Sequence, residues 1–344
     1  MDLLPSEFIS YARYAKVSNA KITQIIGHEL MNFLPASEED LVSREIPQNN
    51  EIPIKNWKLL EKPTHVFSFK KIARRDVFQA YQLFYEKSND KLTLVGTNRF
   101  NAVLFEAYSS QTNFIKDISE KYEHYERINQ DLNAIQQLSS DEFFVFTALL
   151  ELFTEKYPTP NTDWSPDELL VFTKESLLKI ISDSEEKLED QTWWQHWQKI
   201  NEIAVPNNDN LETAILLLAN KGFVGILDDI NGKEVFFIGQ SLVWILRSLV
   251  WWDLGFVIEN EQNKTKLFVL QASALFALIV EDNQNFSLFN IEGAQLPKLL
   301  SNFMNDSDEK NTETDSKKLN FCPNCGAPVI SEAKFCANCG NKLT

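Results

Sequence analysis

All four cysteines of this chain fall within one eighteen-residue stretch near the C-terminus, and they constrain its fold more than any other feature. They occur in two copies of Phe-Cys-x-Asn-Cys-Gly, at residues 321–326 and 335–340. Each Cys-x-x-Cys turn points two thiolates at one metal ion, and the glycine relieves the tight backbone after the second ligand. Four thiolates complete a tetrahedron with no open position for water. The pattern therefore predicts one structural zinc ion, held by Cys322, Cys325, Cys336 and Cys339.

The alternative for these cysteines is a redox pair or a set of disulfide bonds. A module of about 24 residues has almost no hydrophobic core, so a metal ion has to supply its folding free energy, on the order of 10 kcal/mol. The ten residues between the two cysteine pairs are fewer than in many zinc sites, but short zinc ribbons have such spacing.

Residues 321–342 resemble the small zinc-ribbon modules that are appended to many bacterial and archaeal proteins. The resemblance implies a module that contacts protein or nucleic acid. Here the module carries only Lys334 and Lys342 against Glu332, and it has no arginine. So few positive charges disfavour phosphate binding and favour contact with protein.

The length of 344 residues predicts two or three folded units. Residues 305–320 contain one leucine and no other large hydrophobic side chain, which predicts a flexible linker before the ribbon. We therefore expect an α+β protein in four parts: an α+β domain of unknown role at 1–135, an acidic domain of helices and antiparallel sheet at 136–304, the linker at 305–320 and the zinc ribbon at 321–344.

The formal net charge is −16, and residues 136–304 alone contribute −14, from 11 Lys and Arg against 25 Asp and Glu. Such a chain repels nucleic acid phosphates and anionic membranes. The most apolar window, 241–258, is broken by Arg247 and Asp253, so no membrane insertion is expected. The N-terminus has no signal-peptide pattern, and cysteines confined to one metal module suit a reducing cytoplasm.

Residues 1–135 show mixed signals of helix and strand and resemble no family. Residues 1–34 have helical spacing, and 35–63 are expected to be an irregular connector. Strands are predicted at 65–69, 91–95 and 102–107, residues 77–85 fit strand or helix, and 113–138 is predicted as one long polar helix.

The middle of the chain opens with two predicted helix starts, at Ser139 with Glu142 and at 165–168. Both predicted helices contain a similar heptapeptide, which indicates chance or similar packing rather than duplication. A helix at 211–218 and a hairpin of 223–227 with 234–238 follow. A β-meander and a last helix complete the region, with strands at 254–259, 266–270, 275–280 and 286–291 and the helix at 295–304.

The helix and hairpin from 211 to 238 suggest a winged helix, but its wing carries Asp228, Asp229 and Glu234 against Lys233. Contact with protein therefore suits it better than contact with DNA. The strand order of the meander, with its last helix, makes 211–304 similar to the substrate chaperones of type VII secretion systems. That resemblance implies a twisted antiparallel sheet with flanking helices, and it transfers no functional residue.

No other residues form a recognisable catalytic or cofactor-binding motif, and none is assigned to either role. The four histidines are scattered, at His28, His65, His124 and His196. One further cluster is interpreted as a solvated basic face, with binding of a phosphate group or an acidic partner as the alternative: Lys70, Lys71, Arg74 and Arg75. Another is interpreted as core packing, with an exposed aromatic binding surface as the alternative: Trp193, Trp194 and Trp197.

The leading hypothesis is a cytoplasmic, non-enzymatic adaptor or chaperone with a structural zinc ribbon. Its expected partner is a protein with a basic face that docks on 211–304, through the sheet edges and the acidic rim. The alternatives are a transcription-linked protein built from a winged helix and a ribbon, and an enzyme of unrecognised class in residues 1–135. Binding to nucleic acid is not expected.

Overall fold

The computed structural model describes most of the chain before the ribbon and four residues at the start of the ribbon region. The described residues are 2–3, 5–26, 54–73, 76–97, 103–125, 135–157, 169–186, 193, 195, 197, 204–228, 234–250, 254–281, 284–305, 320–321 and 328–329. Among them, no helix is long and apolar enough to cross a membrane.

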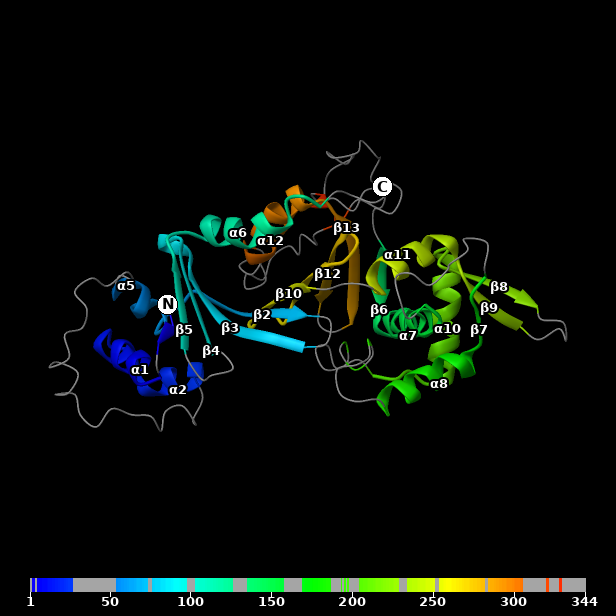
Figure 1. Cartoon of the computed structure of the whole chain (residues 1–344), viewed down its shortest axis with the longest axis horizontal. Coiled ribbons are helices and arrows are strands. Elements are labelled where there is room, and N and C mark those ends of the chain that lie inside the picture. The colour runs from blue at the N-terminus through cyan, green and yellow to red at the C-terminus, as the bar shows by residue number, and fades with distance from the viewer. Residues whose placement is uncertain are drawn as a thin grey trace, which may run out of the picture.

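One antiparallel sheet of ten strands runs through the molecule (Figure 1). The strands pair in the order β1-β5-β4-β3-β2-β10-β11-β12-β13-β6. Their bounds are β1 Asp2–Leu3, β2 His65–Ala73, β3 Asp76–Glu86, β4 Lys91–Thr97, β5 Val103–Tyr108, β6 Ile135–Ser139, β10 Leu254–Asn260, β11 Lys266–Gln271, β12 Leu275–Glu281 and β13 Asn285–Ile291. The protein is therefore α+β, as the sequence predicts.

The sheet consists of two similar halves. Each half is a meander of four consecutive strands, β2 to β5 and β10 to β13, and the halves meet where β2 pairs antiparallel with β10. A helix precedes each meander and another follows it: α5 (Ile54–Leu59) and α6 (Gln111–Ser119) in the first half, α11 (Gln240–Val250) and α12 (Leu296–Asn305) in the second. The chain thus repeats one helix–meander–helix unit.

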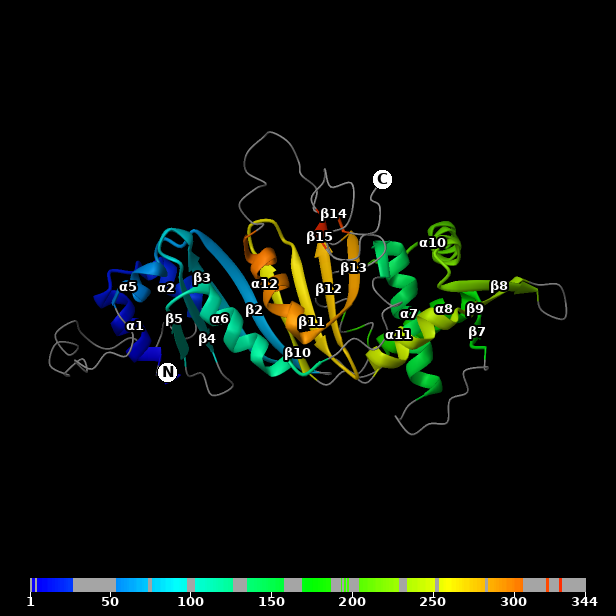
Figure 2. The same cartoon turned by 90° about the horizontal axis from the view of Figure 1, so that it is seen from above.

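The two helices that follow the meanders, α6 and α12, contact each other over the same face of the sheet (Figure 2). Side chains alternate between the faces along each strand, so residues two apart meet the same layer. Phe67 and Phe69 on β2, with Phe256 on β10, belong to the cluster beneath these helices. Burial of these aromatic side chains on both central strands joins the two halves.

The opposite face of the sheet is covered by different helices at its two ends. Helices α1 (Pro5–Tyr14), α2 (Asn19–Ile26) and α5 cover the end formed by β3, β4 and β5, where Trp57 stacks on Phe105 with ring centroids 4.0 Å apart. At the other end, Phe143 stacks on Phe286 at 4.0 Å and Trp197 meets Phe268 edge-on at 5.2 Å. These contacts fix the helical region of residues 140–250 to β11 and β13.

That helical region has the element order of a winged helix. Its helices are α7 (Ser140–Lys156), α8 (Lys174–Glu185), α10 (Asn208–Asn220) and α11, and its strands are β7 (Val171–Phe172), β8 (Val224–Asp228) and β9 (Glu234–Ile238). The strands form a small antiparallel sheet in the order β7-β9-β8. Helix α7 contacts α8, α10 and α11, and α10 leads directly into the β8–β9 hairpin.

Local sequence explains where these helices begin and end. Ser139 accepts from the backbone N–H of Glu142, and the Glu142 carboxylate accepts from that of Ser139, which is the predicted capping box. Thr173 and Ser176 form a similar box at α8. Helix α10 ends at Asn220, and Gly222 follows two residues later with a φ of 75°, the left-handed conformation that glycine adopts without a steric penalty.

Several sequence predictions are confirmed. Each predicted strand from 65 to 107 and from 254 to 291 is present, and 77–85 lies within strand β3. The helix at 211–218, the hairpin after it and the last helix are present as α10, β8–β9 and α12. The boundary expected at residue 135 stays a prediction, although strands from both sides of it share one sheet.

Three predictions are wrong in their described parts. The long helix expected over 113–138 ends at Ser119, a 3₁₀ turn covers Glu120–Tyr122, and 135–139 is strand β6. The connector expected over 35–63 contains helix α5, because Trp57 and neighbouring apolar side chains are buried against the sheet. The helix predicted to start at 165–168 is wrong in its described part, where Val171 and Phe172 form strand β7, and residues 165–168 themselves lie outside the described residues. The heptapeptide match to the helical 141–147 therefore reflects no shared structure.

Candidate functional site

The zinc ribbon is described only at two short strands. Strand β14 (Asn320–Phe321) pairs antiparallel with β15 (Pro328–Val329), and Cys322 and Cys325 lie between them in the sequence. All four predicted ligands lie outside the described residues, so their assignment stays a prediction. Among the described residues, no group of three or more His, Cys, Asp or Glu side chains is placed to hold a metal ion.

Helix α10 occupies the position of the recognition helix in a DNA-binding winged helix. It contains Asp209 and Glu212, both exposed, and no lysine or arginine. Its outward surface also carries Leu216 and Leu217, which are 39% and 42% exposed. Such a helix offers no positive charge to a phosphate backbone, and it offers apolar area to a protein.

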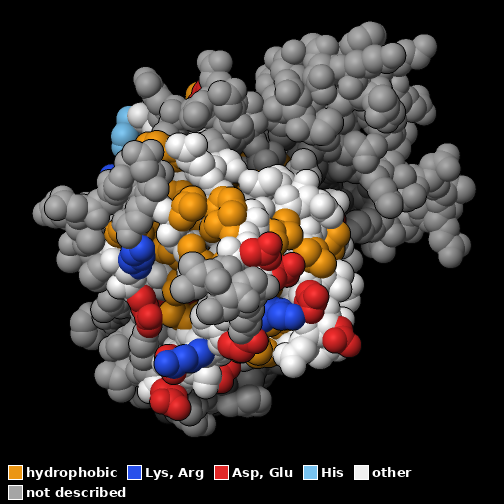
Figure 3. Space-filling view, turned by 90° about the vertical axis from the view of Figure 1, so that its right-hand side faces the viewer, with side chains coloured by type: hydrophobic (Ala, Val, Ile, Leu, Met, Phe, Trp, Pro, Cys, Tyr) orange, Lys and Arg blue, Asp and Glu red, His pale blue; other side chains and the backbone are white. Residues whose placement is uncertain are grey.

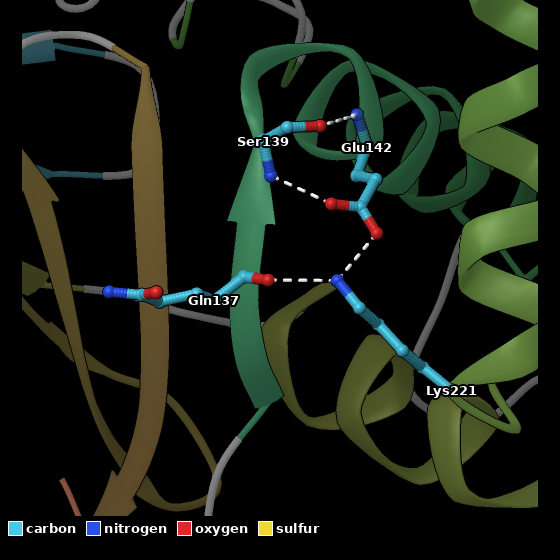
Figure 4. Close-up of polar contacts among 4 residues, drawn as sticks. All are labelled: Gln137, Ser139, Glu142 and Lys221. Carbon is cyan, nitrogen blue, oxygen red and sulfur yellow. Dashed lines mark hydrogen bonds and ion pairs between the residues drawn. The ribbon is translucent and has the colours of Figure 1, made fainter.

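Lys221, which directly follows α10, forms an ion pair and a hydrogen bond within the fold. Lys221 Nζ lies 2.5 Å from Oε1 of the buried Glu142 and donates to the Gln137 backbone oxygen at 2.8 Å (Figure 4). The other Glu142 oxygen accepts from the Ser139 backbone N–H at 2.8 Å. This network joins the end of α10 to α7 and β6, and it engages the lysine that directly follows the recognition helix in an ion pair away from that helix's exposed surface.

The rest of the winged-helix-like region is acidic as well. Residues 140–250 contain 8 Lys and Arg against 19 Asp and Glu, a net charge of −11. Lys174 is one of these cations, and it lies 2.6 Å from Glu212. That hydrogen bond raises the pKa of Lys174, with smaller contributions from Glu175 and Glu234. Carboxylates from α8, α10 and β9 therefore all act on this one ammonium group, and Glu212 pairs with it directly.

The exposed large hydrophobic side chains of the described residues all lie in this same part of the chain, between residues 169 and 244. They come from β7 and the residues before it, α10, β8, α11 and the segment before α10: Leu169, Val171, Val205, Leu216, Leu217, Ile226, Leu227 and Trp244. Exposed apolar side chains that lie together mark a binding surface more often than scattered single residues do. The sequence analysis missed these residues, because an apolar side chain in a helix or strand is ordinarily expected to be buried, and only the fold shows which ones are exposed.

The meander offers less surface than the sequence analysis expected. Its outer strands are both paired, β10 with β2 and β13 with β6. Its two faces are covered, one by α6 and α12 and the other by the winged-helix-like region. The expected docking at the edges of this meander is therefore not available. The exposed large hydrophobic side chains in the described part of 211–304 lie on α10, β8 and α11.

A second polar group lies in residues 1–135, on the sheet face that α6 covers. The Tyr108 hydroxyl lies 3.1 Å from Glu106 Oε2 and 3.0 Å from Asp117 Oδ2. Lys71, from the predicted basic cluster, has its Nζ 5.3 Å from the centre of the Tyr81 ring. Burial lowers the pKa of Lys71, and burial together with the two carboxylates raises the pKa of Tyr108 far above its ordinary value.

The buried tyrosines give a testable pH dependence. Burial raises the pKa of Tyr122 to about 12, against about 10 in an unfolded chain. Because the folded pKa is the higher one, the stabilisation is present below about pH 10 and is lost as the pH rises toward about 12. We expect the urea midpoint to fall over this range, and to fall less steeply in Tyr122→Phe. An equal slope in the two proteins would contradict the prediction.

The structure also places several of the other candidate residues named in the sequence analysis. His65 is buried, and its Nδ1 lies 3.1 Å from Gln262 Oε1. Trp193 and Trp197 are buried in the core, as the packing interpretation predicts. His124 is exposed. The remaining candidates lie outside the described residues or have no described side chain: His28, His196, Arg74, Arg75, Trp194 and Asp229.

A comparison with known protein families matches residues 321–343 to the zinc-ribbon domain. The domain implies a structural zinc ion, so the chain is a zinc-binding protein. A comparison with curated proteins found no match. The family match covers the ribbon alone, and the resemblance of 211–304 to type VII secretion chaperones receives no support from it.

Proposed function

We propose that this chain is a cytoplasmic, non-enzymatic adaptor or chaperone that binds another protein through its winged-helix-like region. The observation that carries the proposal is the surface of that region. Its recognition helix and wing present Asp209, Glu212, Asp228 and Glu234 together with exposed leucines, where a DNA-binding winged helix presents basic side chains. The zinc ribbon supplies a second, smaller contact in this proposal, which raises avidity when both contacts form on one partner.

Binding to duplex DNA tests the proposal directly. Each phosphate contact releases counterions only where a positive charge lies close to it, and residues 140–250 have a net charge of −11. We expect no binding of the full-length zinc-loaded protein to mixed-sequence duplex DNA at physiological salt, measured by fluorescence anisotropy. Submicromolar, salt-sensitive binding would contradict the prediction and favour the alternative of a transcription-linked protein.

The transcription-linked alternative is favoured by one observation, the order α7-β7-α8-α10-β8-β9 with its β7-β9-β8 sheet, which DNA-binding winged helices share. Protein partners distinguish the two functions. Tagged protein purified from its own cells, followed by mass spectrometry, should yield a stoichiometric protein partner that survives nuclease treatment. A partner lost on nuclease treatment would support the alternative.

A further inference from the structure

The small β7-β9-β8 sheet packs one face against the core and leaves the other face outside it. The core face is itself exposed toward the hairpin end, where Ile226 is 44% exposed. Phe172, Phe236 and Ile238 point inward with Val224, and each is almost fully buried in the cluster that includes α10. Cross-strand pairs fix which side chains share the other face, because directly paired residues lie on the same side of a sheet. Those pairs are Val171 with Phe237, Phe237 with Gly225, and Val235 with Leu227.

This outward face is apolar across all three strands. Val171 is 49% exposed and Leu227 is 41% exposed, while Val235 and Phe237 are half-buried. A Cβ atom on Gly225 would lie 2.0 Å from Phe237 Cζ, so the ring lies flat across β8 because that position is glycine. An antiparallel sheet with one solvated face ordinarily carries polar side chains there. The four apolar side chains on this face therefore form a hydrophobic surface that is partly exposed to water.

Acidic side chains gather at the hairpin end of this sheet. Asp228 pairs with Glu234 one position beyond the pair formed by Leu227 and Val235, so these two exposed carboxylates leave the sheet on its other face. The charges of Glu175, Glu212 and Glu234 all act on the ammonium group of Lys174, and Glu212 lies 2.6 Å from it. Figure 3 faces the end of the molecule that carries this sheet, and it shows hydrophobic side chains gathered beside acidic ones.

We propose that the outward face of β7-β9-β8 binds a segment of a partner protein that carries two or three large apolar side chains next to lysine or arginine. The inference rests on the proposed adaptor function and names its docking surface. The apolar pairs supply the buried contact area. The carboxylates around the hairpin end, in a region of net charge −11, favour a basic flank that extends beyond the apolar face. A second copy of this chain does not fit, because two regions of net charge −11 would repel each other.

The test uses peptides selected from a random display library on the immobilised full-length zinc-loaded protein. We expect the selected peptides to combine apolar residues with lysine or arginine. The double variant Val171→Ser with Leu227→Ser should weaken their binding by about tenfold or more, because small apolar clusters carry most of the affinity at such surfaces. The reversal Glu234→Lys should weaken binding and reduce its salt dependence. Fluorescence anisotropy titrations measure both effects.

The matched control is Val205→Ser, which removes a valine with the same 49% exposure as Val171 from the segment before α10, outside the small sheet. It should leave peptide affinity unchanged, and circular dichroism should show that each variant is folded. Equal binding to wild type and to the double variant would overturn the proposal, as would selection of acidic peptides or a loss confined to Val205→Ser.

The surface and the function can fail separately. If a natural partner co-purifies and binds the double variant as tightly as the wild type, the surface is wrong and the adaptor function stands. If the selected peptides depend on Val171 and Leu227 but no natural protein co-purifies, the surface stands and the adaptor function is wrong.

Discussion

Full-length protein purified under reducing, zinc-replete conditions should contain one zinc ion per chain, and the variant Cys336→Ser with Cys339→Ser should contain none. Two thiolates alone leave a tetrahedral site half empty, so the remaining pair cannot hold the ion at ordinary zinc concentrations. Because the ribbon has almost no hydrophobic core, loss of the ion should unfold it entirely, a change on the order of 10 kcal/mol. Elemental analysis measures the zinc, and amide hydrogen exchange within 321–344 measures the folding.

The same preparations test whether the ribbon is independent of the rest of the chain. Residues 305–320 contain a single leucine, so we expect the zinc-free variant to keep the hydrogen-exchange protection of the ten-stranded sheet. Two zinc ions per chain, or an ion retained by the double serine variant, would contradict the assignment of four ligands to one site. Lost protection in the sheet would show that the ribbon packs on the body.

The second meander was predictable from the sequence and the first was only partly so, and burial explains the difference. Strands β11 and β12 are apolar on both faces, because helices cover both, and they appear in the sequence as short continuous hydrophobic runs between polar turns. In β3, which includes residues 77–85, apolar and polar side chains do not alternate strictly, and the sequence left strand or helix open.

The repeat of helix, meander and helix could not be seen in the sequence. It is a repeat of topology in which the residues differ, and it becomes visible only through the pairing of β2 with β10. That pairing joins residues almost two hundred positions apart, such as Lys70 with Val257. The long helix expected over 113–138 failed for a related reason, since the partner of β6 is β13, far along the chain.

The candidate docking surface was also only partly predictable, because its charge follows from the sequence alone whereas its position depends on contacts between distant residues. The acidic wing and the absence of basic residues on α10 were visible in the sequence, because charge composition needs no contacts. The exposure of Val171 was not visible, because β7 gains its neighbours only when Val171 pairs with Phe237 on the distant strand β9. Sequence could therefore predict what kind of partner is excluded, and the fold was needed to place the surface.

Replacing Lys221 by methionine should destabilise the folded protein by about 3 kcal/mol, the size of effect seen when one member of a buried ion pair is removed. The Glu142 side chain is only 5% exposed, so without Lys221 its carboxylate stays buried with the Ser139 backbone N–H as its described partner. The Gln137 backbone oxygen loses its donor as well. Urea denaturation followed by tryptophan fluorescence measures the loss.

A double variant tests whether the unpaired buried carboxylate, rather than the lost packing of the lysine side chain, causes the destabilisation. In Glu142→Gln with Lys221→Met both charges are gone, and the glutamine oxygen can still accept from Ser139 at the start of α7. We expect this double variant to recover most of the lost stability, since a buried pair replaced at both positions often costs little. A double variant as unstable as Lys221→Met alone would show that packing, and not the unpaired carboxylate, sets the cost.

The matched surface control is Lys174→Met, which removes an equally short ion pair from a solvated position. Lys174 lies 2.6 Å from Glu212, but their side chains are 35% and 49% exposed, so water replaces the lost contact and little change in stability is expected. Equal effects of Lys174→Met and Lys221→Met would contradict the structural role assigned to Lys221. Lys221 would then be free to meet a phosphate, and the argument that α10 lacks a usable cation would fail with it.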